Sequence, residues 1–163
     1  MILSFWRDTK GAALVEGAIL LPFLFILVLG IFEFSWFIFQ HHMVTGGLRD
    51  ATRYLTRART PCDPSSEAWD VAQINAKRLA TTGFINGSKL RVPGWQPDMI
   101  TIRCTPVENP IIEGLRTYRG GEIIYTITVS TVFNETPLGF FGLLGFKDPV
   151  ISLFYSQRII GPG

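Results

Sequence analysis

The two cysteines are the residues whose chemistry follows most directly from their type and spacing. Cys62 and Cys104 form no C-x-x-C pair and have no histidine at metal-ligand spacing. They suit a single disulfide in an oxidising compartment, which would close a loop of about 43 residues and contribute about 4 kcal/mol by the loop-entropy estimate. Two unpaired, buried thiols are the alternative.

Two glutamates lie within a long apolar segment, where a carboxylate is costly. Between residues 11 and 40, Glu16 and Glu33 are the only ionisable side chains, and a carboxylate near the centre of a bilayer costs roughly 2.5–3.5 kcal/mol. Glu33 lies near the far end of the segment, where it could reach the interface or become protonated. Glu16 follows Gly11 by five residues, a spacing that favours a role in processing.

No other pattern predicts catalysis or metal binding. His41 and His42 are adjacent and have no third ligand nearby, so we expect them to be solvated. The sequence has no phosphate loop, no nucleophile elbow and no paired acid/base carboxylates after the apolar segment. We therefore expect no catalytic residue, no metal and no cofactor.

The apolar segment is long enough to cross a bilayer. As a helix, residues 12–39 would span roughly 42 Å, compared with a hydrocarbon core of roughly 30 Å. A secretory signal peptide is the alternative, but its apolar region is only about 7–15 residues long and a small-residue cleavage site follows it. No such site precedes Phe39, so we predict one transmembrane helix.

The composition excludes several classes of protein. The chain has 163 residues, of which 47% are hydrophobic and 17% charged, and its apolar excess is concentrated in that one segment. A single segment excludes a multi-span transporter, and thirteen Phe with four Trp exclude intrinsic disorder. The net charge of +2, without a lysine- and arginine-rich patch, gives no reason to expect nucleic acid.

Residues 1–57 carry a set of motifs that resembles a known family. A short basic run at residues 7–10 is followed by a Gly-Ala-Ala-x-x-Glu core at 11–16. The apolar span has a proline at its Leu-Pro pair, residues 21–22, and a Gly-Ile-x-Glu-Phe segment at 30–34. An Ala-x-Arg-Tyr helix end lies within residues 50–54. The first two motifs resemble a class III signal of the type IV pilin superfamily. Together the motifs resemble TadE-like minor pilins of the tight-adherence (Flp) pilus system.

The resemblance implies a processing site and a set of partners. A prepilin peptidase would cut between Gly11 and Ala12, and the new amine of Ala12 could pair with Glu16 of a neighbouring subunit, satisfying both charges. A favourable charge on the first helical turn is the alternative role of Glu16. Glu33 is a second candidate for assembly within the membrane. The implied partners are the peptidase, other pilin or pseudopilin subunits, an inner-membrane assembly platform and the lipid bilayer.

The short basic amino tail and the cysteine pair predict the orientation. Arg7 and Lys10 favour a cytoplasmic N-terminus, whereas the arginines that follow the span favour the reverse on charge alone. A disulfide requires an oxidising periplasm for the rest of the chain. We therefore predict a single-pass protein of the bacterial inner membrane, with a periplasmic C-terminal domain and incorporation into an extracellular pilus as a further expectation.

Hydrophobic periodicity predicts an α+β fold. The transmembrane helix would continue to Arg57 as an amphipathic helix, bending at residues 46–47, and a second helix with Asp63 as its N-cap would end at Gly83. Period-two alternation predicts strands of an antiparallel sheet over residues 100–104, 125–133 and 151–156. The predicted organisation is a leader at 1–11, a transmembrane and extended helix at 12–57, and a periplasmic α+β domain at 58–163.

An apolar, glycine-rich loop, residues 138–146, interrupts the last two predicted strands. Its nine residues cannot span a bilayer. The loop either folds back on the core of the domain or forms a patch that contacts a partner or the membrane.

These features predict a structural protein and not an enzyme. The leading hypothesis is a minor pilin or pseudopilin that assembles, primes or tips a Tad (Flp) pilus used in adhesion or secretion. The alternative is an unprocessed single-span periplasmic scaffold protein of a secretion machine. An enzyme tethered by one helix has no candidate catalytic residues in this sequence.

Overall fold

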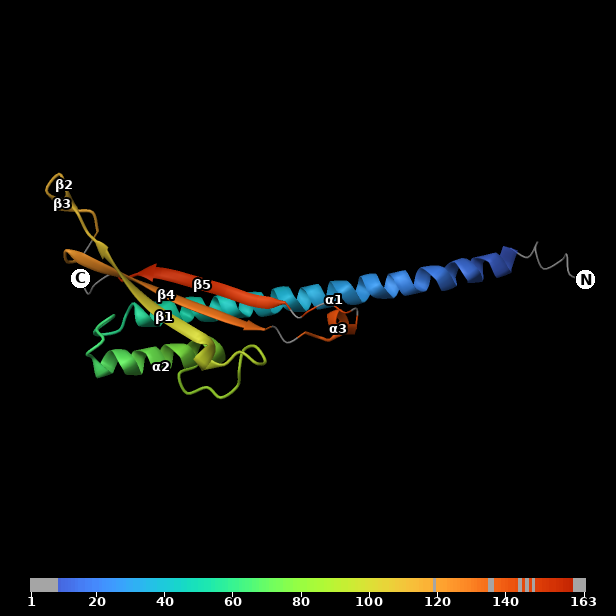
Figure 1. The fold of residues 1–163 in the computed structure, drawn as a ribbon, viewed down its shortest axis with the longest axis horizontal. Coiled ribbons are helices and arrows are strands. Elements are labelled where there is room, and N and C mark those ends of the chain that lie inside the picture. The colour runs from blue at the N-terminus through green and yellow to red at the C-terminus, as the bar shows by residue number, and fades with distance from the viewer. Residues whose placement is uncertain are drawn as a thin grey trace, which may run out of the picture. The chain divides into compact units, whose positions relative to one another are not determined.

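The computed structural model confirms the predicted α+β class (Figure 1). It describes residues 9–118, 120–134, 137–143, 145, 147 and 149–159, without the side chains of Thr9, Lys10 and Ala12. The predicted leader therefore lies outside the described residues up to position 8. The elements are α1 (Thr9–Leu55), α2 (Glu67–Thr82), η2 (Pro97–Met99), β1 (Ile100–Glu108), β2 (Ile111–Ile112), β3 (Leu115–Arg116), β4 (Ile123–Asn134), α3 (Phe140–Leu143) and β5 (Val150–Arg158).

The chain forms two compact units. The first comprises Met1–Phe37 with Pro137–Lys147, and the second comprises Ile38–Thr136 with Asp148–Gly163. The apolar loop thus belongs to the unit that contains the N-terminal part of α1, and not to the unit that contains the sheet. Two of its residues, Leu144 and Phe146, lie outside the described part of the chain.

The N-terminal part of α1 is apolar on every side. Its large apolar side chains from Leu14 to Leu29 are between 38% and 77% exposed, so no face of the helix is buried within the chain. A helix that is apolar all round and not covered by protein is typical of a membrane span. Among the described residues, α1 is the one helix that is long and apolar enough to cross a membrane.

The sheet of the second unit is antiparallel, with β4 between β1 and β5 (Figure 1). Its register places Val129 of β4 opposite Ile102 on one side and opposite Tyr155 on the other. Alternate residues of β4 from Ile127 to Phe133 are buried, as the period-two pattern predicted. A separate two-stranded hairpin, β2 with β3, was not predicted.

A disulfide between Cys62 and Cys104 joins the α1–α2 connection to β1, with 5.8 Å between the two Cα atoms. The predicted N-cap of α2 is wrong, because Ser66 and not Asp63 precedes the first helical residue. Asp63 instead accepts hydrogen bonds from the backbone N–H and the hydroxyl of Ser65. These two bonds lower the pKa of Asp63 below its ordinary value. The predicted end of α2 is confirmed, since Gly83 caps it in the left-handed conformation at φ 87°.

The indole of Trp95 organises the core of the second unit. It is fully buried and stacks on Phe133 with 6.1 Å between ring centroids. Its Nε1 donates to the hydroxyl of Thr131 at 3.0 Å, so the polar atom of the ring is satisfied. On the other side it packs against Gly47, which lies within the unbroken helix α1.

Gly47 is required by this close approach. A Cβ added there would lie 2.8 Å from Cη2 of Trp95 and would overlap the backbone oxygen of Ala80. The neighbouring Gly46 is different, because its nearest atom, Nη1 of Arg91, would be 3.9 Å away. The sequence predicted a bend for this glycine pair and did not foresee the packing role of Gly47.

We expect Gly47→Ala to destabilise the protein by about 1–3 kcal/mol, because overpacking must displace either the indole or α2. Gly46→Ala is the matched control and should be neutral or stabilising by up to about 1 kcal/mol, since it replaces a helical glycine where space is available. Thermal unfolding of full-length protein in detergent, followed by circular dichroism, measures both. Equal melting temperatures for the two variants would contradict the packing role.

Candidate functional site

The first candidate site lies at the start of α1. Gly11 is exposed, and a Cβ added to it would meet no atom within 4 Å. The backbone of Ala12 is helical, whereas its side chain lies outside the described residues. Glu16 is exposed and has no hydrogen bond or ion pair to the described part of the chain. Since Glu16 follows Ala12 by four residues, its Cα lies about 6 Å along the axis from the position where cleavage would create an amine.

The second carboxylate of the apolar helix, Glu33, has a different environment. Its side chain is only 1% exposed. Its Oε1 accepts a hydrogen bond from the backbone N–H of Gly139 at 3.3 Å, and its Oε2 accepts one from the backbone N–H of Phe140 at 3.4 Å. All three residues belong to the first compact unit. Glu33 therefore holds the apolar loop through backbone contacts that the sequence analysis missed.

The two glutamates form separate sites. They are seventeen residues apart in one helix, which corresponds to about 25 Å along the axis. Glu33 is satisfied by its own chain, whereas Glu16 faces outward. The structure therefore does not bring the two predicted assembly residues together within one chain.

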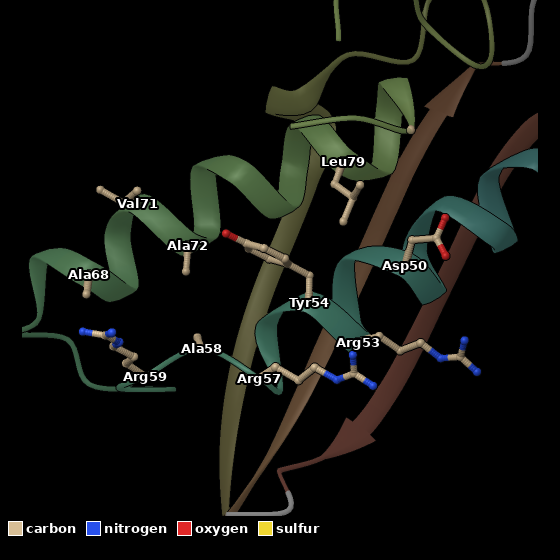
Figure 2. A pocket seen from close by; sticks show the side chains of 11 residues that line it. Asp50, Arg53, Tyr54, Arg57, Ala58, Arg59, Ala68, Val71, Ala72 and Leu79 are labelled. Atoms are coloured by element: carbon tan, nitrogen blue, oxygen red, sulfur yellow. The ribbon is translucent and has the colours of Figure 1, made fainter. Parts of the chain in front are cut away.

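A third feature is an open, basic groove of about 720 Å³ in the second unit. Figure 2 shows it between the end of α1 and α2, with Tyr54 pointing from α1 toward α2 and Arg59 pointing toward the first turn of α2. Ala68, Ala72 and Leu79 supply apolar lining.

The groove carries more unpaired positive charge than negative charge. Its carboxylate, Asp50, is paired with Arg91 at 2.8 Å. Arg53, Arg57 and Arg59 are exposed at its rim, and the described residues offer them no ion pair. Such a surface can attract anionic groups. Asp50, Tyr54 and these arginines do not make a nucleophile paired with a base.

The histidine pair does not form a metal site with other described residues. His41 is half-buried and His42 is exposed, with 6.4 Å between the ring centroids. Within the described ranges, no three His, Cys, Asp or Glu side chains gather at a distance suited to a metal ion.

Most of α1 is similar in sequence to a known protein family. Residues 11–53 match the family model described as TadE-like protein. This segment is TadE-like. The TadE-like segment contains Gly11, Glu16 and Glu33 and ends two residues before the end of α1. No curated protein and no solved structure matches the chain. A TadE-like segment indicates a component associated with a Tad pilus.

Proposed function

We propose that this protein is a minor pilin or pseudopilin of a Tad (Flp) pilus. The observation that carries the proposal is the TadE-like segment at residues 11–53, which coincides with the exposed apolar helix and includes Glu16. In this function α1 anchors the subunit in the bacterial inner membrane, with its N-terminus in the cytoplasm. The second unit, with its disulfide, is periplasmic, and the subunit primes or tips a pilus used in adhesion or secretion.

The exposed surface of α1 supports assembly by side-by-side helix packing. From Leu14 to Leu29 the chain itself covers none of the large apolar side chains. Such a surface can face lipid before assembly and the helices of other subunits afterwards, because both environments are apolar. The proposed partners are other pilin or pseudopilin subunits, the assembly platform of the inner membrane and the lipid bilayer.

Prepilin peptidase is the proposed processing partner. Cleavage between Gly11 and Ala12 leaves an amine four residues before Glu16. A neighbouring subunit that is shifted by about one helical turn then places its own amine beside this carboxylate. Pairing offsets the cost of holding both charges in an apolar bundle. The proposed role is structural and not catalytic.

An unprocessed periplasmic scaffold of a secretion machine is the second candidate function. One observation favours it: Gly11 lies within α1, which begins at Thr9, and not in an extended segment. In this alternative the same helix anchors the protein, but residues 1–11 are retained. Processing therefore distinguishes the two functions.

We expect Gly11→Val to accumulate as full-length protein in the membrane, because a branched side chain obstructs the scissile bond. Gly30→Val is the matched control, since a Cβ at Gly30 also meets no atom within 4 Å, and it should be shortened normally. Mass spectrometry of the membrane fraction, with and without prepilin peptidase, measures both. Wild-type protein from piliated cells that retains its first eleven residues would exclude the processed pilin.

Glu16→Ala should still be shortened but should fail to support piliation, because the amine of the neighbouring subunit loses its partner. Glu16→Asp retains a carboxylate and should restore part of the piliation. Electron microscopy of surface pili, together with the mass of the subunit, separates assembly from cleavage. Normal piliation by Glu16→Ala would rule out the pairing role even if cleavage occurs after Gly11.

The orientation predicts that the second unit is outside the cytoplasm. Ser88 is exposed, and the native cysteines are joined in a disulfide, so Ser88→Cys offers one reactive thiol. A membrane-impermeant maleimide should label it in intact spheroplasts. Labelling that occurs only after lysis would reverse the orientation.

A further inference from the structure

We infer that the Pro137–Lys147 loop is a second membrane-contacting element, which Glu33 positions in the lipid interface beside α1. The inference rests on the membrane anchoring by α1 that is proposed above. It adds a lipid contact that the helix alone does not supply, in the leaflet at the C-terminal end of the span.

The contact between Glu33 and the loop suits a place with little water. A buried carboxylate needs hydrogen-bond donors, and the backbone N–H groups of a loop in an apolar environment need acceptors. Glu33 supplies two acceptor oxygens, and Gly139 and Phe140 supply two donors. The carboxylate and the two N–H groups thereby offset the free-energy cost of burying each other's polar atoms. Gly139 adopts φ 105°, a conformation that favours glycine.

The position of Glu33 along α1 sets the depth of the loop. Lys10 is the last basic residue before the apolar segment, and a hydrocarbon core takes about 20 helical residues. A span that starts just after Lys10 therefore ends close to Glu33. Because the loop is bonded to Glu33, it lies at the level where hydrocarbon gives way to headgroups.

The composition of the loop matches this level. Residues 137–146 comprise only Pro, Leu, Gly and Phe, and Lys147 follows them. Leu143 is 80% exposed and Leu138 is also exposed. Water makes such exposure unfavourable, whereas an acyl chain region buries the same side chains. The exposed Lys147 can extend its ammonium toward lipid phosphates.

These observations favour lipid, and not a protein partner, as what covers the exposed apolar side chains of the loop. The loop belongs to the same compact unit as the uncovered apolar surface of α1. On α1, Leu29 and Phe32 are exposed just before Glu33. The helix and the loop therefore both expose large apolar side chains, which the same lipid environment can cover. A lipid surface therefore continues from the helix onto the loop.

The test uses full-length protein in phosphatidylcholine and phosphatidylglycerol vesicles. Leu143→Cys is labelled with the fluorophore NBD under non-reducing conditions, in which the native cysteines are held in their disulfide. Two matched sites are labelled in the same way: Leu115→Cys in β3, where the native side chain is 76% exposed, and Leu24→Cys in α1, where it is 57% exposed. Iodide quenches probes in water, and nitroxide-labelled lipids quench probes in the bilayer.

We expect the probe at position 143 to be quenched by nitroxide lipids, as at position 24, and to be quenched by iodide several-fold less than at position 115. If position 143 behaves like position 115 while position 24 responds to nitroxide lipids, the loop inference fails and the anchoring stands. If position 24 is also open to iodide, both proposals fail. A probe at 143 that neither reagent quenches is covered by protein, which also overturns the lipid contact.

Glu33→Ala tests the positioning role. It removes both acceptors, so the loop should leave the interface and the iodide quenching of the probe at 143 should rise several-fold. Glu16→Ala is the matched control, because it removes a carboxylate from the same helix without touching the loop. An unchanged circular dichroism spectrum and unchanged quenching at position 115 show that the fold persists. Quenching at 143 that does not change in Glu33→Ala would exclude Glu33 as the positioning residue.

Discussion

The structure depends on one constraint: α1 is a single helix whose two ends have different surroundings. Near its N-terminus the helix is apolar on all sides and uncovered, whereas from Val44 onward only one stripe is buried. That stripe consists of Val44, Leu48, Ala51 and Leu55, at steps of four, three and four residues. This spacing is what one face of a helix requires when the opposite face meets water. The side chains of one continuous helix therefore change from apolar and exposed on all sides to apolar and buried on one side.

The second unit is built around the buried stripe by a close backbone approach. Trp95 fills the space that Gly47 leaves open, and its N–H is satisfied by Thr131 of the central strand. Thr131 in turn donates to the backbone oxygen of Met99, where β1 is about to begin. One indole thus connects α1 with the central strand β4, Thr131 extends the connection to η2, and the disulfide adds a covalent connection to β1.

Those parts of the structure that depend on local patterns could be predicted from the sequence. Hydrophobic periodicity predicted the apolar span and the alternating strands. The conformational preference of glycine predicted the end of α2 at Gly83. The sequence has only two cysteines, which predicted the pairing. The start of α2 could not, because Asp63 and Ser66 are both good N-cap residues and Asp63 is used in its own turn.

Long-range contacts left no local signal. The bond between Glu33 and Gly139 joins residues 106 apart, and its donor is a backbone N–H, which almost any residue carries. The role of Gly47 was hidden for a similar reason, since a glycine in a helix indicates a bend or close packing equally well. The β2–β3 hairpin has two residues in each strand, too few to establish an alternation.

The two carboxylates of α1 show why processing and assembly can be one event in the function that we propose. Glu33 finds its donors in its own chain, so it can remain in an apolar region without a partner subunit. Glu16 finds none among the described residues and needs a donor from outside. An uncleaved subunit offers an uncharged amide N–H at Ala12, and only cleavage converts that group into a cation. The charge that Glu16 requires is therefore created by the same step that releases the leader, which favours bundles of processed subunits over bundles of unprocessed ones.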